Sequence, residues 1–129
     1  MKIVIADPLP LSAGELLRSE GWTVIESKGL QPEALYSELA DTDGLIVRSA
    51  TKVSSDLIRQ APRLRVVARA GTGVDNVDLA AASARGILVL NAPGANSISV
   101  AEHTVALMLA AARSIPLADA QMKAGKWEK

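Results

Sequence analysis

The chain has 129 residues, of which 49% are apolar, with 14 basic side chains balanced by 14 acidic ones and no cysteine. This length suits one soluble globular domain, and a net charge of zero gives no general field that would attract nucleic acid or a membrane surface. The lack of cysteine excludes disulfides, thiolate nucleophiles and sulfur-ligated metals, and it fits a reducing compartment. The first residues also lack a secretory signal pattern, so we expect a cytoplasmic protein.

Short apolar runs alternate with helical patterns along the first 95 residues. We expect strands at residues 2–6, 22–26, 44–48, 64–68 and 86–90, and helices at residues 11–21, 31–41, 54–62 and 76–86. Strict alternation with short connections indicates right-handed crossovers. The sequence therefore predicts an α/β fold, in which a flavodoxin-like or Rossmann-like parallel five-stranded sheet has helices on both faces.

Residues 96–113 form the longest helical pattern, and apolar side chains cover nearly its whole circumference. Such a surface normally means burial on several sides. The pattern is too short, and too interrupted by Glu102 and His103, to span a bilayer. His103 is the only histidine, and we expect it to be packed or interfacial rather than catalytic. Without a second histidine, we expect no metal site.

The stretch "RAGTGVDNVD" at residues 69–78 follows a predicted buried strand and has the glycine spacing of a dinucleotide-binding turn. A true G-x-G-x-x-G fingerprint needs a third glycine, a place after the first strand and an acidic residue closing the next strand. Here the third position is Asn76, the turn follows the fourth strand in sequence, and Asn91 closes the next strand. We conclude that this turn is not a dinucleotide fingerprint.

The same turn suits a small anion. Gly71 and Gly73 leave backbone amides open at the carboxyl end of a parallel strand, where open α/β sheets bind ligands, and Arg69 adds a positive charge. The preceding strand ends in "RSATK", which supplies Arg48, Ser49, Thr51 and Lys52. Two adjacent strand ends of this kind predict a small-anion pocket. The alternative is that the arginines cap helices or pair with surface acids.

Other polar residues near these loops have structural interpretations. Asp75 and Asp78 suit the shaping of the turn and the cap of the next helix. Asn96 or Ser97 suits the cap of the long helix, whose first amides could also face a ligand.

Two other users of five-stranded α/β sheets fit poorly. A phospho-receiver would find its acidic group in Asp7, but Arg48 stands where the third strand should end in a phosphorylatable aspartate. A flavodoxin needs a hydroxyl- and glycine-rich phosphate loop after the first strand and aromatic residues around the flavin. Here that loop reads "DPLPL", and the chain has two Trp, one Tyr and no Phe.

Four phrases occur together and in order: "GLIVRSATKV", "VVARAGTGVDNVDL", "GILVLNAPGANSISVAEHT" and "MKAGKWEK". They resemble the amino-terminal part of the D-isomer-specific 2-hydroxyacid dehydrogenases, and among these the NAD-dependent enzymes that oxidise 3-phosphoglycerate to 3-phosphohydroxypyruvate at the entry to serine biosynthesis. The resemblance implies a flavodoxin-like substrate-binding domain at residues 1–95. It implies that residues 96–129 are a helical segment that leads into a NAD-binding domain and contributes to dimerisation.

The resemblance also implies roles for particular residues. The implied substrate contacts are Arg48, Ser49, Ala50, Arg69, Gly71, Thr72 and Gly73. Thr72 would also border the nicotinamide of NAD, and Asn96 would lie between substrate and cofactor. Trp127 and Lys129 fall in a segment that reaches the partner subunit's active site in some members.

By the same resemblance, the NAD fingerprint and the catalytic arginine, glutamate and histidine lie beyond residue 129, and His103 is not the catalytic histidine. We therefore expect no catalytic residue in this chain, binding of a small phosphorylated 2-hydroxy acid, and no tight binding of NAD. We expect a two-fold homodimer through residues 98–112, because monomers rarely leave so apolar a surface exposed. The alternative is a free-standing small-anion binding or assembly module that has lost catalysis.

Overall fold

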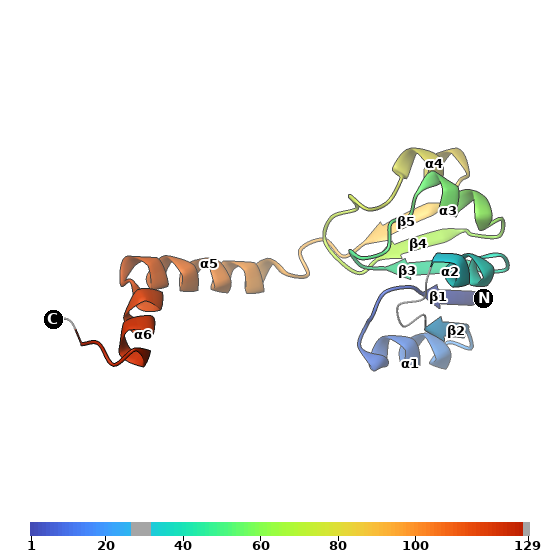
Figure 1. The fold of residues 1–129 in the computed structure, drawn as a ribbon. Coiled ribbons are helices and arrows are strands. Elements are labelled where there is room, and N and C mark those ends of the chain that lie inside the picture. Colours follow the sequence, from blue (N-terminus) through green and yellow to red (C-terminus); the bar gives the residue numbers. More distant parts are fainter. Residues whose placement is uncertain (27–31, 128–129) are drawn as a thin grey trace. The chain divides into compact units, whose positions relative to one another are not determined.

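Strands and helices alternate along the first of two units in this chain. The structure, a computed structural model, describes residues 1–26 and 32–127. Its contacts divide the chain into the units Met1–Pro93 and Gly94–Lys129. Among the described residues, the first unit holds the sheet and its helices, and the second holds two helices (Figure 1).

The first unit is built on one parallel sheet. Its strands are β1 (Lys2–Ile5), β2 (Thr23–Glu26), β3 (Gly44–Val47), β4 (Val66–Arg69) and β5 (Leu88–Asn91). Its helices are α1 (Leu11–Ser19), α2 (Pro32–Leu39), α3 (Ser55–Gln60) and α4 (Leu79–Ala84). The strand order is β2-β1-β3-β4-β5, and every pairing is parallel. The predicted α/β class with a five-stranded parallel sheet is confirmed.

Two of the predicted strands, 64–68 and 86–90, begin too early. Leu64 and Ile87 are apolar because they are buried in the turns that lead into β4 and β5, with 4% and 6% of their surface exposed. Gly86 belongs to the turn that ends α4, where its φ is +64° and its N–H donates to Ser83 O at 3.0 Å. Glycine accepts this left-handed backbone without strain.

Side-chain caps set the starts of two helices. Ser54 Oγ accepts from the N–H of Leu57 at 3.3 Å, and Asp78 Oδ1 accepts from the N–H of Ala81 at 3.0 Å. The predicted cap at Asp78 is therefore confirmed. It also explains why the predicted helix 76–86 begins at Leu79. For the predicted helix 31–41, Gln31 lies outside the described residues.

The hydrophobic core lies between the sheet and helices α2, α3 and α4, which pack side by side on one face (Figure 1). Val4, Leu45 and Val67 project into it from three neighbouring strands and are at most 1% exposed. Leu39 of α2 and Ile58 of α3 meet them and are equally buried. Burying a side chain of this size contributes about 1.5 to 3 kcal/mol.

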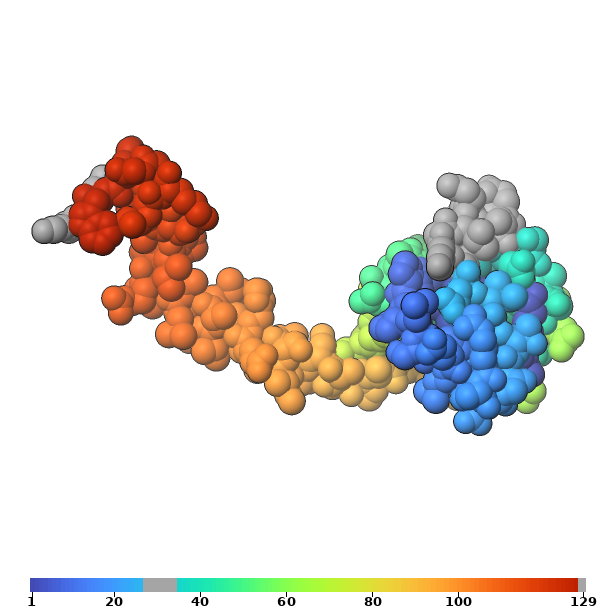
Figure 2. All heavy atoms as spheres, turned by 90° about the horizontal axis from the view of Figure 1, so that it is seen from below, coloured from blue at the N-terminus to red at the C-terminus, as the bar shows by residue number. Residues whose placement is uncertain are grey.

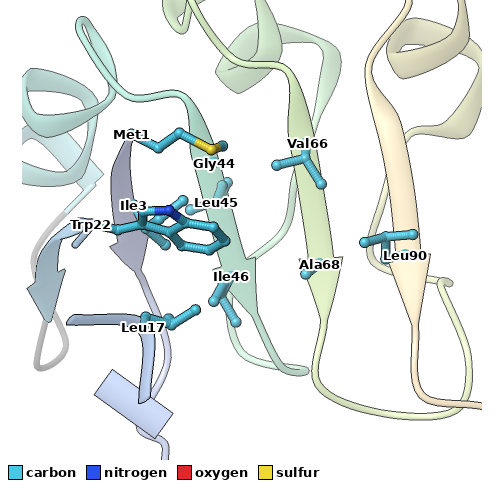
Figure 3. A pocket seen from close by; sticks show the side chains of 10 residues that line it. All are labelled: Met1, Ile3, Leu17, Trp22, Gly44, Leu45, Ile46, Val66, Ala68 and Leu90. Carbon is cyan, nitrogen blue, oxygen red and sulfur yellow. The ribbon is translucent and has the colours of Figure 1, made fainter. Parts of the chain in front are cut away.

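Among the described residues of this unit, α1 covers the opposite face of the sheet, near β1 and β2 (Figure 1). Beyond α1, Leu88 and Leu90 of β5 are 58% and 47% exposed. A groove of about 240 Å³ runs along this face, with Trp22 and Leu17 at the β1 end and Leu90 at the β5 end (Figure 3). Its lining side chains are apolar, so the groove offers nothing to hold an anion.

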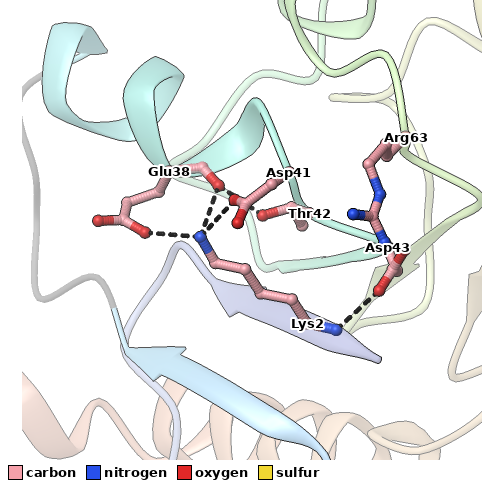
Figure 4. A network of polar contacts seen from close by, with 6 residues as sticks. All are labelled: Lys2, Glu38, Asp41, Thr42, Asp43 and Arg63. Carbon is pink, nitrogen blue, oxygen red and sulfur yellow. Dashed lines mark hydrogen bonds and ion pairs between the residues drawn. The ribbon is translucent and has the colours of Figure 1, made fainter.

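Lys2, at the start of β1, ties that strand to the turn between α2 and β3 (Figure 4). Its Nζ lies 2.5 Å from Asp41 Oδ1 and 3.1 Å from Glu38 Oε2, and its backbone N–H donates to Asp43 Oδ2 at 2.8 Å. Arg63 pairs with the other Asp43 oxygen at 3.0 Å. Hydrogen bonding to Asp41 raises the pKa of Lys2 despite its burial, and the Lys2 amide lowers the pKa of Asp43. This network lies at the amino ends of the strands, far from the predicted pocket.

The second unit consists of α5 (Ser97–Ala112) and α6 (Ile115–Lys123), which are separated by Ser114 in a left-handed conformation with φ of 50°. Asn96 holds the capping position of α5, as predicted, but its side chain accepts no capping hydrogen bond. Among the described residues no single helix could span a membrane, although α5 and α6 together, bent by 63°, meet the length and composition of a broken span.

Apolar side chains of α5 and α6 face solvent within this unit. In Figure 2 their atoms, orange to red, have nothing of their own unit packed over them on the face shown. The exposed members of α5 are Ile98, Val100, Val105, Leu107, Met108 and Leu109, each more than half exposed. His103 is exposed as well, so of the two expected settings, packed or interfacial, it is not packed within its own unit. An interfacial role stays a prediction.

Candidate functional site

The carboxyl ends of four strands form one edge of the sheet. The register pairs Ile5 with Ile46, Val47 with Arg69, and Arg69 with Asn91. The residues that follow β1, β3, β4 and β5 therefore lie in a row. The two stretches expected to bind an anion, 48–52 and 69–73, begin on the neighbouring strands β3 and β4.

The loop after β3 presents its first residues to solvent. Arg48, Ser49 and Ala50 are exposed, and the Arg48 guanidinium makes one long contact, 3.5 Å from Pro8 O. Thr51 is only half-buried and turns its hydroxyl inward. The loop therefore offers a cation, a hydroxyl and a small side chain at the edge where open α/β sheets bind ligands.

Asp7, which follows β1, holds this loop from the inside. Its Oδ2 accepts from the N–H of Arg48 at 2.6 Å and from that of Thr51 at 3.2 Å, and its Oδ1 accepts from the Thr51 hydroxyl at 2.6 Å. The residue is 4% exposed. Burial raises its pKa, but the Thr51 hydroxyl and the amides of Arg48, Thr51 and Ala50 outweigh that effect, so the pKa lies below its usual range.

Asn76 holds the same loop from the side of β4. Its Nδ2 donates to Arg48 O and to Thr51 O, each at 2.7 Å. Its backbone carbonyl accepts from the N–H of Val53 at 2.8 Å, next to the short parallel bridge between Val53 and Val77. The loops after β3 and β4 are therefore joined along their length.

Arg69 folds over the glycine turn instead of pointing outward. Its Nη1 donates to Gly73 O at 2.9 Å, its Nε contacts Arg48 O at 3.4 Å, and its Nη2 lies 3.8 Å from Asp75 Oδ1. The side chain is 14% exposed. A Cβ on Gly71 would lie 2.8 Å from Nη1, so the glycine makes room for this arginine. The Gly71 N–H donates to Arg69 O at 2.8 Å.

The end of β5 anchors the glycine turn from its other side. Asn91 Nδ2 donates to Thr72 O at 2.6 Å, and the N–H of Ala92 donates to Gly71 O at 2.9 Å. Asn91 could not replace the acidic residue of a dinucleotide fingerprint, but it fixes the exposed Thr72. The turn is thus braced by the strand on each side of it.

A hollow of about 370 Å³ opens where the two loops meet. Its lining includes Lys52 and the two acidic residues Asp75 and Asp78. Two negative charges against one positive charge do not suit a phosphate or a carboxylate. The exposed surface of residues 48–50, rather than this hollow, is the candidate anion site.

A family model described as "D-isomer specific 2-hydroxyacid dehydrogenase, catalytic domain" matches residues 3–123. The chain belongs to this family.

Similarity to individual members supports the assignment to this dehydrogenase family. The chain is 55% identical over 128 residues to a D-3-phosphoglycerate dehydrogenase of Sus scrofa, a match that covers 99% of this chain and 24% of that protein. Two crystal structures have the same fold. The TT0316 protein of Thermus thermophilus is 34% identical with a TM-score of 0.89, and the match covers 100% of this chain and 42% of that one. The NAD+-bound 3-phosphoglycerate dehydrogenase of Entamoeba histolytica is 32% identical with a TM-score of 0.75, and the match covers 85% of this chain and 38% of that one. The chain thus spans about a quarter of the length of its curated relative.

The sequence predicts which two loops form the candidate site, but not the side chains that bond to these loops. The two stretches expected to form an anion pocket do meet at one sheet edge. Arg69 meets a surface acid, Asp75, as the plainer alternative proposed. The roles of Asp7 and Asn76 were missed. The available signals were an acid directly after the first strand and an asparagine in place of the third glycine.

The remaining predicted site residues belong to the second unit. Asn96 precedes α5, and Trp127 follows α6 and is 72% exposed. Lys129 lies outside the described residues.

The glycine turn does not form a cradle for the pyrophosphate of NAD. In the glycine turn the Gly71 N–H is bonded to Arg69 O, and the Asn76 side chain occupies the place of the third glycine. The same described part of the chain contains no cluster of three or more acidic or histidine side chains placed to hold a metal.

Proposed function

We propose that this chain is the substrate-binding part of an NAD-dependent D-3-phosphoglycerate dehydrogenase, which oxidises 3-phosphoglycerate to 3-phosphohydroxypyruvate at the entry to serine biosynthesis. Residues 1–95 form the substrate-binding domain in this proposal. Residues 96–129 form the helical segment that leads toward the cofactor domain. Identity of 55% to a named relative over 99% of this chain supports the substrate assignment.

One observation carries this proposal: a braced loop presents Arg48, Ser49 and Ala50 at the carboxyl edge of the sheet. The Arg48 guanidinium suits a carboxylate or a phosphate, with which it can form two parallel hydrogen bonds. Ser49 adds a hydroxyl, and the small Ala50 leaves space for the ligand. Lys52 follows this loop and is exposed, but it also lines the hollow that holds Asp75 and Asp78, so Arg48 is the main cation for the substrate.

The glycine turn completes this substrate surface. Arg69, turned inward, contributes positive charge from behind Gly71 and Gly73 rather than by direct contact. Gly71, Thr72 and Gly73 then border the carboxylate of the substrate. Thr72 and Asn96 are the two residues that we assign to the neighbourhood of the nicotinamide. The glycine turn offers no pyrophosphate cradle, which supports the expectation that this chain alone does not bind NAD tightly.

We further infer a homodimer in the cytoplasm. The exposed apolar side chains of α5 support self-association through residues 98–112, because water-exposed patches of this kind mark interfaces. In such a dimer Trp127 and Lys129 reach toward the partner subunit's site. The lack of cysteine supports a reducing compartment.

An amide NMR titration of the 129-residue chain with 3-phosphoglycerate tests the substrate assignment. Inorganic sulfate serves as the control anion. We expect shifts confined to residues 48–52 and 69–74 that exceed those caused by sulfate. Shifts identical to those of sulfate would instead favour the alternative, a small-anion binding or assembly module without substrate selectivity. Added NADH and 3-phosphohydroxypyruvate should give no turnover with this chain.

A further inference from the structure

Asp7 and Asn76 contact one short loop, residues 48–51, from two sides. We propose that both are positioning residues: their side chains hold the backbone of this loop so that Arg48, Ser49 and Ala50 face the ligand. The identity of the ligand rests on the proposed function.

The polar groups of the loop are divided between the two side chains. Asp7 accepts from the N–H groups of Arg48 and Thr51, while Asn76 donates to the carbonyls of the same two residues. At each end of the loop, at Arg48 and at Thr51, both the backbone N–H and the backbone carbonyl are therefore hydrogen-bonded. The backbone between these two residues is held in place. A loop that is ordered before the ligand arrives loses less conformational entropy on binding.

The contacts at position 7 suit a carboxylate. The Asp7 contacts at 2.6 to 3.2 Å all come from donors, and an ionised carboxylate only accepts hydrogen bonds. Asparagine has the same shape and could accept from both amides only with its NH₂ group turned to the Thr51 hydroxyl, and the amides would then meet a neutral acceptor in place of a charged one. Among the described residues Asp7 has no ion-pair partner, although it is 4% exposed. A buried charge is costly unless it is fully hydrogen-bonded, and the hydrogen bonds of this carboxylate come from the loop.

Position 76 has the opposite requirement to position 7, because its side chain must donate hydrogen bonds. Both neighbours of its amide nitrogen are carbonyl oxygens at 2.7 Å, which fixes the orientation of the side chain. Its Oδ1 is buried and has no partner among the described residues, as expected for a side chain placed to donate. Aspartate at this position would set one carboxylate oxygen against both carbonyl oxygens, which would repel it.

The test compares Asp7→Asn with Asp43→Asn in the 129-residue chain. Asp43 is a matched control because it also accepts a backbone N–H, from Lys2 at 2.8 Å, but at the other end of the sheet. We measure amide hydrogen exchange at residues 48–51 and the affinity for 3-phosphoglycerate. Asp7→Asn should lower the protection of the Arg48 and Thr51 amides and weaken binding about tenfold, because a neutral acceptor replaces a charged one. Asp43→Asn should lower stability without either effect.

Two further variants guard the result against a failure to fold. Thr51→Val removes one donor to Asp7 and should weaken binding by a smaller factor, and Asn76→Asp should reproduce the effect of Asp7→Asn. Unchanged loop amides in Asp7→Asn, or equal weakening by Asp43→Asn, would overturn the inference. If the unmodified chain does not prefer 3-phosphoglycerate to sulfate, the proposed function fails, and the loop amides alone decide whether Asp7 and Asn76 position the loop.

Discussion

The guanidinium of Arg69 lies over Gly71, so close that a Cβ on the glycine would stand 2.8 Å from Arg69 Nη1 and 3.1 Å from its Cζ. Glycine is therefore needed at position 71 to leave space for the Arg69 side chain. The arginine in turn is held by Gly73 O and by the loop after β3. The glycine turn, which has the spacing of a phosphate-binding turn in the sequence, is occupied in the structure by the Arg69 side chain.

Gly71→Ala should displace the Arg69 side chain. The stability cost should be small, about 1 kcal/mol, because the end of a flexible side chain gives way. The amide signals of residues 48–52 should nevertheless move, since Arg69 loses its contact with Arg48 O. Gly86→Ala is the control: its φ of +64° should give a cost of about 1 to 2 kcal/mol with no change at the loop. A loop spectrum unaltered by Gly71→Ala would show that Arg69 does not couple the two loops.

Asp7 makes the stability of the fold depend on acid. Its pKa is lowered in the folded chain, so its contribution is present above the unfolded carboxyl value of about 4 and is lost as pH falls through the folded value. The gap in unfolding free energy between the unmodified chain and Asp7→Asn should be largest above about pH 4 and should close below it. Urea unfolding at a series of pH values measures this gap. A gap that does not vary with pH would mean that Asp7 is not ionised when folded.

Lys2 should produce the opposite dependence at high pH. Its pKa is raised by Asp41 and Glu38, so its contribution is present below the unfolded value of about 10.4 and is lost as pH rises through the folded value. Lys2→Met should cost about 1 kcal/mol near neutral pH, and the difference should vanish in strong alkali. Chemical unfolding of both chains between neutral and alkaline pH checks this, and equal stability at neutral pH would contradict it.

The apolar side chains of α5 should drive self-association. Light scattering at tens of micromolar should give twice the mass of one chain, and Leu107→Glu should give a monomer by placing a charge on the interface. Leu16→Glu is the control, because Leu16 is similarly exposed on α1, at 65% against 56% for Leu107. A monomeric unmodified chain would exclude the proposed dimer.

The fold could be predicted further from the sequence than the site. Aliphatic runs separated by helical patterns determine five strands and four helices, because a parallel sheet must bury both faces and its crossovers are helical. Leu64 and Ile87 show the limit: an apolar residue buried in a turn has the same composition as one in a strand, so the starts of β4 and β5 were misplaced.

The contacts at the site could not be predicted from spacing. Asp7 bonds to residues 41 and 44 positions away, and Asn76 bonds to residues 28 and 25 positions away. Such pairings follow from strand order and register and leave no local pattern. Arg69 was expected to face the ligand because its charge is visible in the sequence, whereas the direction of its side chain depends on the carbonyl of Gly73.

We assign substrate binding to the loop that begins at Arg48, and the dissociation constant of 3-phosphoglycerate for Arg48→Gln is the measurement that checks this assignment. Arg59→Gln is the control, since Arg59 is also exposed, lies on α3 and pairs with Asp56. Loss of one charged, paired contact should weaken binding about tenfold in Arg48→Gln, while Arg59→Gln binds as the unmodified chain does. Equal affinities in all three chains would contradict the assignment of this loop to the substrate.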